Sequence, residues 1–176
     1  MRIITSFLLL VVLVQVSPAQ KRGDLRHARS EVIAEAFYGG SGMAKIVGRY
    51  LVARVRRDRS VEFDDYKDGE GFVRRRSTVP DDLFAKLDQF LSERKSRDFA
   101  ATYSAIYPTI DHTENLELRI LIDGKYRALT VENFKPHIEK IRNAYPKMLI
   151  DLACLLESTR GSSEFVFFRT GNECLN

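Results

Sequence analysis

The segment around Asp123 and Gly124 constrains the fold of this chain more than any other part of the sequence. Asp-Gly is a preferred pair for a two-residue hairpin turn, because both positions of that turn need positive φ. Residues 116–122 and 125–131 flank the pair and carry alternating apolar side chains. The sequence therefore predicts an antiparallel hairpin with one apolar face. In its register Leu116 and Leu118 lie opposite Val131 and Leu129, and Ile120 lies on the same face.

Other stretches of the chain also have the patterns of strands. Within residues 45–56, Leu51, Ala53 and Val55 alternate with Val52, Arg54 and Arg56, and residues 61–64 continue the alternation after a polar turn at residues 57–60. This period of two indicates a second hairpin. Residues 31–38 are rich in apolar side chains and run into Gly39, which favours a strand that ends at a glycine-rich turn. We expect two shorter strands at residues 72–78 and 164–169.

Two segments have the spacing of amphipathic helices. Pro80 followed by two aspartates is typical of a helix start, and the apolar residues after it recur at i, i+1, i+4, i+7 and i+8 from Leu83 to Leu91, with the helix expected to end near Lys95. Residues 146–158 repeat this pattern after Pro146, with Cys154 nearly opposite the apolar stripe. Hairpins and one-sided helices together predict an α+β fold. We expect an antiparallel β-sheet built from hairpins, with two amphipathic helices packed on one face.

The first residues of the chain have the composition of a secretion signal. Arg2 precedes a nearly unbroken apolar run over residues 3–16, and Ser17-Pro18-Ala19 places small residues where a signal peptidase reads them. We expect a signal peptide at residues 1–19, a flexible lead-in at residues 20–30 and a single α+β domain at residues 31–176. The protein is then secreted or periplasmic, with no membrane span after cleavage. An uncleaved anchor is the alternative, although the run is short for a bilayer.

Cys154 and Cys174 are the two cysteines of the chain. Export would place them in an oxidising compartment, where cysteines pair. Closing the loop between them would stabilise the fold by about 3 kcal/mol in the chain-entropy description. We therefore expect a Cys154–Cys174 disulfide; two free thiols in a less oxidising compartment are the alternative.

A glycine-rich stretch, Gly39-Gly40-Ser41-Gly42, is the first candidate for a functional site. Such a stretch leaves backbone N–H groups accessible and could hold an anion or the backbone of a partner. It lacks the second glycine that a serine nucleophile elbow needs, because Met43 stands at that position. A flexible connection between strands is the simpler interpretation of the stretch.

The polar cluster of Asp111, His112 and Glu114 is the second candidate. Its one histidine has no second histidine three to five residues away, so a loop cap is favoured over a metal site. A hydrolase that uses Ser41 or Asp111 and His112 in a site assembled in three dimensions stays an alternative. The sequence predicts no catalytic residue, no metal and no cofactor.

A group of arginines is the third candidate for a functional site. The formal net charge of +4 is small against 28 basic and 24 acidic residues, so it does not indicate a nucleic-acid partner. Glu62 and Asp64 are expected opposite Arg54 and Arg56 across the second hairpin. This interleaving favours a self-neutralised face, and an acidic partner or a polyanion is the functional alternative. The arginines that we expect to contribute are Arg54, Arg56, Arg74 and Arg76.

The order of these elements resembles a group of uncharacterised exported bacterial domains. The motifs that carry the resemblance are AFYGGSG, YLVARVRRDRSVEF, VPDDLFAKLDQFL, ILIDGKYRALTV and YPKMLIDLACLL, which span most of residues 34–158. In that group the first turn often holds two cysteines around a glycine, which residues 38–42 replace here. The strand that enters Gly39-Gly40 is also similar to the opening of emfourin, a protein inhibitor of bacterial metalloproteases.

Together these features predict an exported, non-enzymatic binding or interaction module. Its partner would be a protein or a component of the cell envelope, and an inhibitor of an extracellular protease is one version of this prediction. The secreted hydrolase is one alternative, and a structural envelope protein without a small ligand is another.

Overall fold

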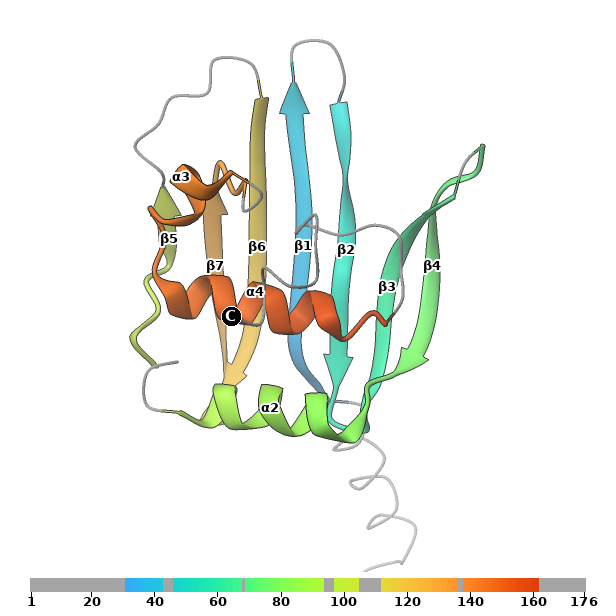
Figure 1. Cartoon of the computed structure of the whole chain (residues 1–176). Coiled ribbons are helices and arrows are strands. Elements are labelled where there is room, and N and C mark those ends of the chain that lie inside the picture. Colours follow the sequence, from blue (N-terminus) through green and yellow to red (C-terminus); the bar gives the residue numbers. More distant parts are fainter. Residues whose placement is uncertain are drawn as a thin grey trace, which may run out of the picture.

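The computed structural model describes residues 31–42, 46–67, 69–93, 97–104, 112–135 and 138–161. Its strands are β1 (Val32–Gly42), β2 (Ile46–Arg56), β3 (Ser60–Lys67), β4 (Gly71–Thr78), β5 (Thr102–Ser104), β6 (His112–Ile122) and β7 (Lys125–Glu132). Its helices are α2 (Asp81–Ser92), α3 (Glu139–Arg142) and α4 (Lys147–Ser158). The strands form one sheet in the order β4-β3-β2-β1-β6-β7-β5 (Figure 1). The predicted α+β class is confirmed.

The hairpin of β6 and β7 has the predicted register. Leu118 lies opposite Leu129, and Leu116 lies opposite Val131. Asp123 and Gly124 both have positive φ, at 50° and 71°. Such a turn matches the right-handed twist of the two strands, so a local signal was enough to fix this part of the sheet.

The sheet is mixed, whereas the sequence predicted an antiparallel one. β5 pairs with β7 in parallel, with Tyr103 opposite Val131. A strand of three residues is too short to show a period of two, and the residues around it carry aromatics at every fourth position instead. Phe99, just before this strand, is buried and belongs to the apolar core.

The prediction of a turn at the glycine-rich stretch was also wrong. β1 continues through Gly42 and pairs with a strand on each side, so that Gly40 lies opposite Val47 of β2 and Glu114 of β6. A Cβ atom on Gly39 would lie 2.9 Å from the Cα atom of Arg49. Glycine is therefore needed at this position for close strand packing, where the sequence suggested a bend.

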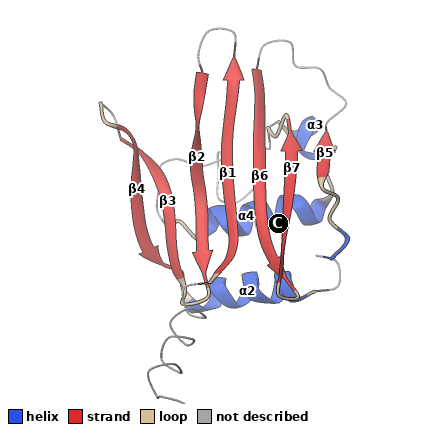
Figure 2. Ribbon diagram, turned by 180° about the vertical axis from the view of Figure 1, so that it is seen from behind, coloured by secondary structure: helices blue, strands red, loops and turns tan. Residues whose placement is uncertain are grey.

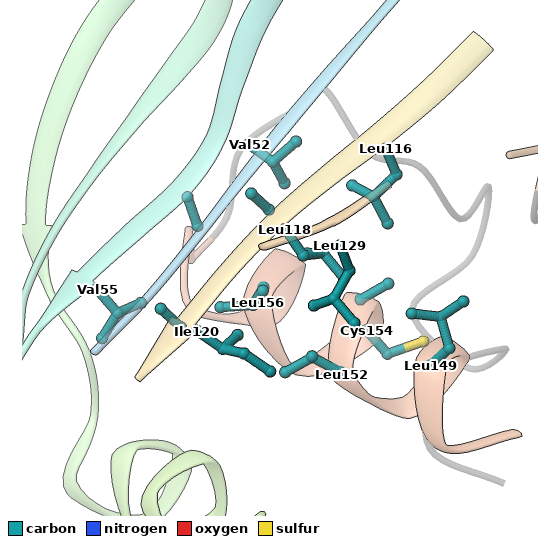
Figure 3. Packing of buried hydrophobic residues seen from close by; sticks show 14 of the residues in the cluster. Val52, Val55, Leu116, Leu118, Ile120, Leu129, Leu149, Leu152, Cys154 and Leu156 are labelled. Atoms are coloured by element: carbon teal, nitrogen blue, oxygen red, sulfur yellow. The ribbon is translucent and has the colours of Figure 1, made fainter. Parts of the chain in front are cut away.

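α2 and α4 lie across the same face of the sheet (Figure 1), and no described helix covers the opposite face (Figure 2). The apolar core lies between the sheet and these helices. Figure 3 shows how side chains of α4 meet those of β6 and β7 there. The fully buried members with the largest side chains include Leu116, Leu118 and Ile120 of the sheet and Leu149, Leu152 and Leu156 of α4.

α4 is buried on more sides than a single apolar stripe allows. Ile150, Ala153 and Glu157 are buried in addition to the predicted stripe. Cys154, expected nearly opposite the apolar stripe, is only 3% exposed and belongs to the apolar core (Figure 3). The local spacing finds the strongest stripe and does not reveal what covers the rest of a helix.

Several predictions concern residues outside the described part of the chain. These are the signal peptide at residues 1–19, the lead-in at residues 20–30, the strand at residues 164–169 and Cys174. The Cys154–Cys174 disulfide therefore stays a prediction. Among the described residues, no helix has both the length and the apolar composition that crossing a membrane requires.

Candidate functional site

The open face of the sheet carries a row of alternating charges. Glu35 and Arg119 alternate along β1 and β6 with Ala36 and Leu118, two buried residues of the core, so they lie on the face away from α2 and α4. Strand pairing continues this row through β2, β3 and β4. Its members, in order across five neighbouring strands, are Arg76, Glu62, Arg54, Glu35 and Arg119.

Ion pairs join each member of the row to the next. The Nε atom of Arg54 lies 2.7 Å from Oε2 of Glu35, and its Nη1 atom lies 3.3 Å from Oε2 of Glu62. Arg76 Nη2 is 2.8 Å from Oε1 of Glu62, and Arg119 Nη1 is 3.7 Å from Oε1 of Glu35. Each carboxylate of the row therefore lies between two arginines of the neighbouring strands.

Carboxylates and guanidinium groups of the row differ in their exposure to solvent. The side chains of Glu35 and Glu62 are each 10% exposed, whereas those of Arg76 and Arg119 are 80% and 53% exposed. The acidic groups thus lie beneath the cations. The predicted self-neutralised face exists, but its outer layer is positive.

Arg56 and Arg74, the two other predicted arginines, border this row. Arg56 Nη2 lies 3.7 Å from the carboxylate of Glu62. Arg74 pairs with Asp64, with Nη2 and Oδ2 3.1 Å apart. The predicted pairing of Asp64 with Arg56 was wrong: Asp64 instead accepts a hydrogen bond of 2.7 Å from the backbone N–H of Leu51.

Two aromatic rings support exposed arginines on the same face. The guanidinium of Arg49 lies 4.0 Å from the ring centroid of Phe37, and that of Arg119 lies 4.1 Å from the ring of Tyr126. Arg49 also pairs with Glu117 at 2.5 Å. Ring contact and ion pair together hold a guanidinium in one orientation. We call the following ten residues the arginine face: Arg49, Arg54, Arg56, Arg74, Arg76 and Arg119, with Glu35, Glu62, Asp64 and Glu117.

The surroundings of Glu62 shift its titration. Partial burial opposes its charge, but Arg56, Arg76 and Arg54 outweigh burial and hold its pKa below the ordinary value of 4.5. For Arg54, partial burial likewise opposes the charge, and Glu35 and Glu62 outweigh it, so the pKa of Arg54 is raised. Both pKa shifts favour the charged forms of Glu62 and Arg54.

We expect the lowered pKa of Glu62 to make stability depend on acid pH. A carboxylate with a lowered pKa stabilises the fold above its unfolded pKa, and this contribution is lost as the pH falls through the lowered value. Urea unfolding between about pH 6 and about pH 3 should therefore show a flatter pH dependence for Glu62→Gln than for the unchanged protein. Parallel curves for the two proteins would contradict the assignment.

The glycine-rich stretch is separate from the arginine row. Gly40 and Glu35 are five residues apart on β1, which corresponds to about 17 Å along an extended strand. The predicted binding residues thus lie in two separate places on the sheet. Those of the first place are Gly39, Gly40, Ser41 and Gly42, and those of the second are Arg54, Arg56, Arg74 and Arg76.

The register also places the residues of the predicted polar cluster. Ser41 lies opposite Thr113, and Gly42 lies opposite His112, while Asp111 lies outside the described residues. Glu114 accepts a hydrogen bond of 2.6 Å from the hydroxyl of Tyr38. Burial, followed by the hydrogen bond and charge of Glu114, raises the pKa of Tyr38. Within the described ranges, no three His, Cys, Asp or Glu side chains gather as a metal site would require.

Comparison with known proteins does not assign the chain to a family. No model of a known protein family matches it, and no curated protein is significantly similar to it. The geometry of the arginine face is therefore the main evidence for what the chain does.

Proposed function

We propose that this protein is an exported, non-enzymatic binding module that attaches through its arginine face to an anionic component outside the cytoplasm. The observation that carries the proposal is the layering of charge along the row, where the exposed side chains of Arg76 and Arg119 lie above the carboxylates of Glu62 and Glu35, which are about one-tenth exposed. Export rests on the composition of residues 1–19.

The ion pairs of the arginine face favour binding in two ways. Six arginines face four carboxylates, so the face keeps an excess of positive charge that attracts anions. The pairs and ring contacts also fix the guanidinium groups before a ligand arrives. Less side-chain entropy is then lost on binding than for mobile lysines.

The alternatives have less support. A hydrolase built on Ser41 and His112 is supported only by the backbone pairing of β1 with β6, which places Ser41 opposite Thr113 and His112 opposite Gly42. The protease-inhibitor version rests on the resemblance of the first strand, and titration against secreted proteases tests it. A structural envelope protein without a ligand would not require exposed, fixed guanidinium groups.

We expect the purified protein to co-sediment with insoluble envelope material of its own host, and to lose this property when the arginine face is neutralised. The test variant is Arg49→Gln/Arg76→Gln/Arg119→Gln. The matched control is Lys86→Gln/Lys140→Gln/Lys147→Gln, which removes the same charge from exposed positions on the helices. Equal loss of binding in both variants would show that net charge alone is responsible and would contradict the proposal.

A further inference from the structure

The row of charges has a direction. It crosses the strands of the sheet from β4 to β6. Neighbouring strands are about 4.8 Å apart, so the five-strand row is about 19 Å long, and its three arginines recur about every 10 Å. Arg76 and Arg119 mark its two ends on β4 and β6, with Arg54 between them on β2.

We infer that the arginine face binds a linear acidic polysaccharide, a sugar polymer with carboxylate or sulfate groups, which lies across the strands along this row. The inference rests on the proposed function and names its partner class. Guanidinium groups form bidentate, charge-assisted hydrogen bonds with carboxylate and sulfate oxygens. The buried carboxylates of Glu35 and Glu62 separate the cations, so the row matches a ligand with spaced charges.

A globular protein partner fits this face less well. Protein interfaces have an apolar centre in which charged residues are depleted. On the arginine face, the rings of Phe37 and Tyr126 lie against guanidinium groups, and the centre of the row is ionic. Besides Tyr126, the large exposed apolar side chains of the described residues are Tyr66, Phe72 and Ile138, none of which belongs to the row.

A nucleic acid fits less well for two reasons. A B-form strand carries one phosphate about every 3.4 Å, which is denser than cations about 10 Å apart. Single strands are commonly bound by bases that stack on aromatic side chains. Here the guanidinium of Arg49 lies over Phe37 and that of Arg119 lies over Tyr126.

The first test measures the affinity of the purified protein by isothermal titration calorimetry at low ionic strength. The probes are polygalacturonate for carboxylate, dextran sulfate for sulfate, and neutral dextran. We expect at least one acidic polymer to bind and neutral dextran not to bind. Affinity should rise with oligosaccharide length until the ligand spans the row, about 19 Å, and change little beyond it.

The second test uses variants of the two ends of the row. Arg76→Gln/Arg119→Gln should weaken binding about tenfold, because two guanidinium–anion contacts are lost. Lys86→Gln/Lys147→Gln removes the same charge from the helices and should keep the affinity. Both end arginines are largely exposed, and urea unfolding curves verify that the variants fold.

Poly-glutamate and a single-stranded DNA oligonucleotide represent the other partner classes. Tighter binding of either than of both acidic polysaccharides overturns the inference, as does equal weakening by the two double variants. If no polysaccharide binds while envelope co-sedimentation still depends on the arginine face, the inference fails and the proposed function stands. If co-sedimentation also fails, both are wrong.

Discussion

Replacing Arg160 by methionine is expected to lower the free energy of unfolding by about 3–5 kcal/mol, the usual cost of removing one partner from a buried ionic cluster. Arg160 follows α4, and only 4% of the residue is exposed. Its Nη2 atom donates a hydrogen bond of 2.9 Å to the backbone carbonyl of Asp64 and lies 3.8 Å from the carboxylate of Asp65. Methionine keeps the apolar stem but leaves these oxygens without their cation. Urea unfolding measures the loss.

The electrostatics of Arg160 give the reason for so large an effect. Burial lowers its pKa, while the nearby Glu157, Tyr50, Asp65 and Asp64 oppose this shift. A cation in this position is retained only because acidic groups and a carbonyl surround it. Its guanidinium also lies 5.3 Å from the ring centroid of Phe63, so α4 is joined to β3 by charge and by packing.

Two further variants separate this explanation from a general effect of substitution in or next to α4. Lys147→Met, at the start of α4 and with a side chain that is 78% exposed, should change stability by less than about 1 kcal/mol. Adding Asp65→Asn to Arg160→Met should recover part of the loss, because it removes the acid left without its partner. Strictly additive effects of the two substitutions would show that Arg160 and Asp65 do not interact.

Local signals in the sequence predicted the parts of this fold that local chemistry decides. The Asp123-Gly124 turn fixed the register of β6 and β7, and Pro80 with its two aspartates marked the start of α2. The pairing of Arg54 with Glu62 followed from the alternation on both sides of one short turn. In each case the partners are close in sequence, so few registers compete.

The rest of the site depends on contacts between distant segments. Glu35 lies beneath Arg119 because β1 pairs with β6, and a period of two reveals the face of a residue but not its neighbouring strand. The sequence therefore missed Glu35, Arg49 and Arg119. One signal was present in the sequence. Glu35 is the only charged residue in the apolar run of residues 32–38, which indicates a buried carboxylate that needs a cation.

Asp64 contacts the backbone of β2 through its side chain and not through the strand pairing of β2 with β3. The β2–β3 pairing includes Arg54 with Glu62 and Val55 with Val61, and Asp64 is two residues beyond Glu62. Its Oδ2 atom accepts the N–H of Leu51, a fully buried residue. A carboxylate thus satisfies a backbone donor that would otherwise be buried without a partner.

Asp64→Ala is therefore expected to lower the free energy of unfolding by about 2–4 kcal/mol, because it leaves a buried donor unsatisfied and removes the ion pair with Arg74. Asp64→Asn keeps an acceptor for Leu51 and should cost about 1 kcal/mol. Arg74→Gln, which removes only a half-exposed partner, should cost no more than about 1 kcal/mol.

Hydrogen exchange at the amide of Leu51 distinguishes this explanation from a loss of charge pairing. If the carboxylate acts as a hydrogen-bond acceptor for β2, exchange should accelerate in Asp64→Ala beyond the change in global stability. The same amide should stay protected in Asp64→Asn and Arg74→Gln. Equal destabilisation by Asp64→Ala and Asp64→Asn, with equal protection of Leu51, would instead mean that Asp64 acts through its charge, and that backbone contacts hold β3 against β2.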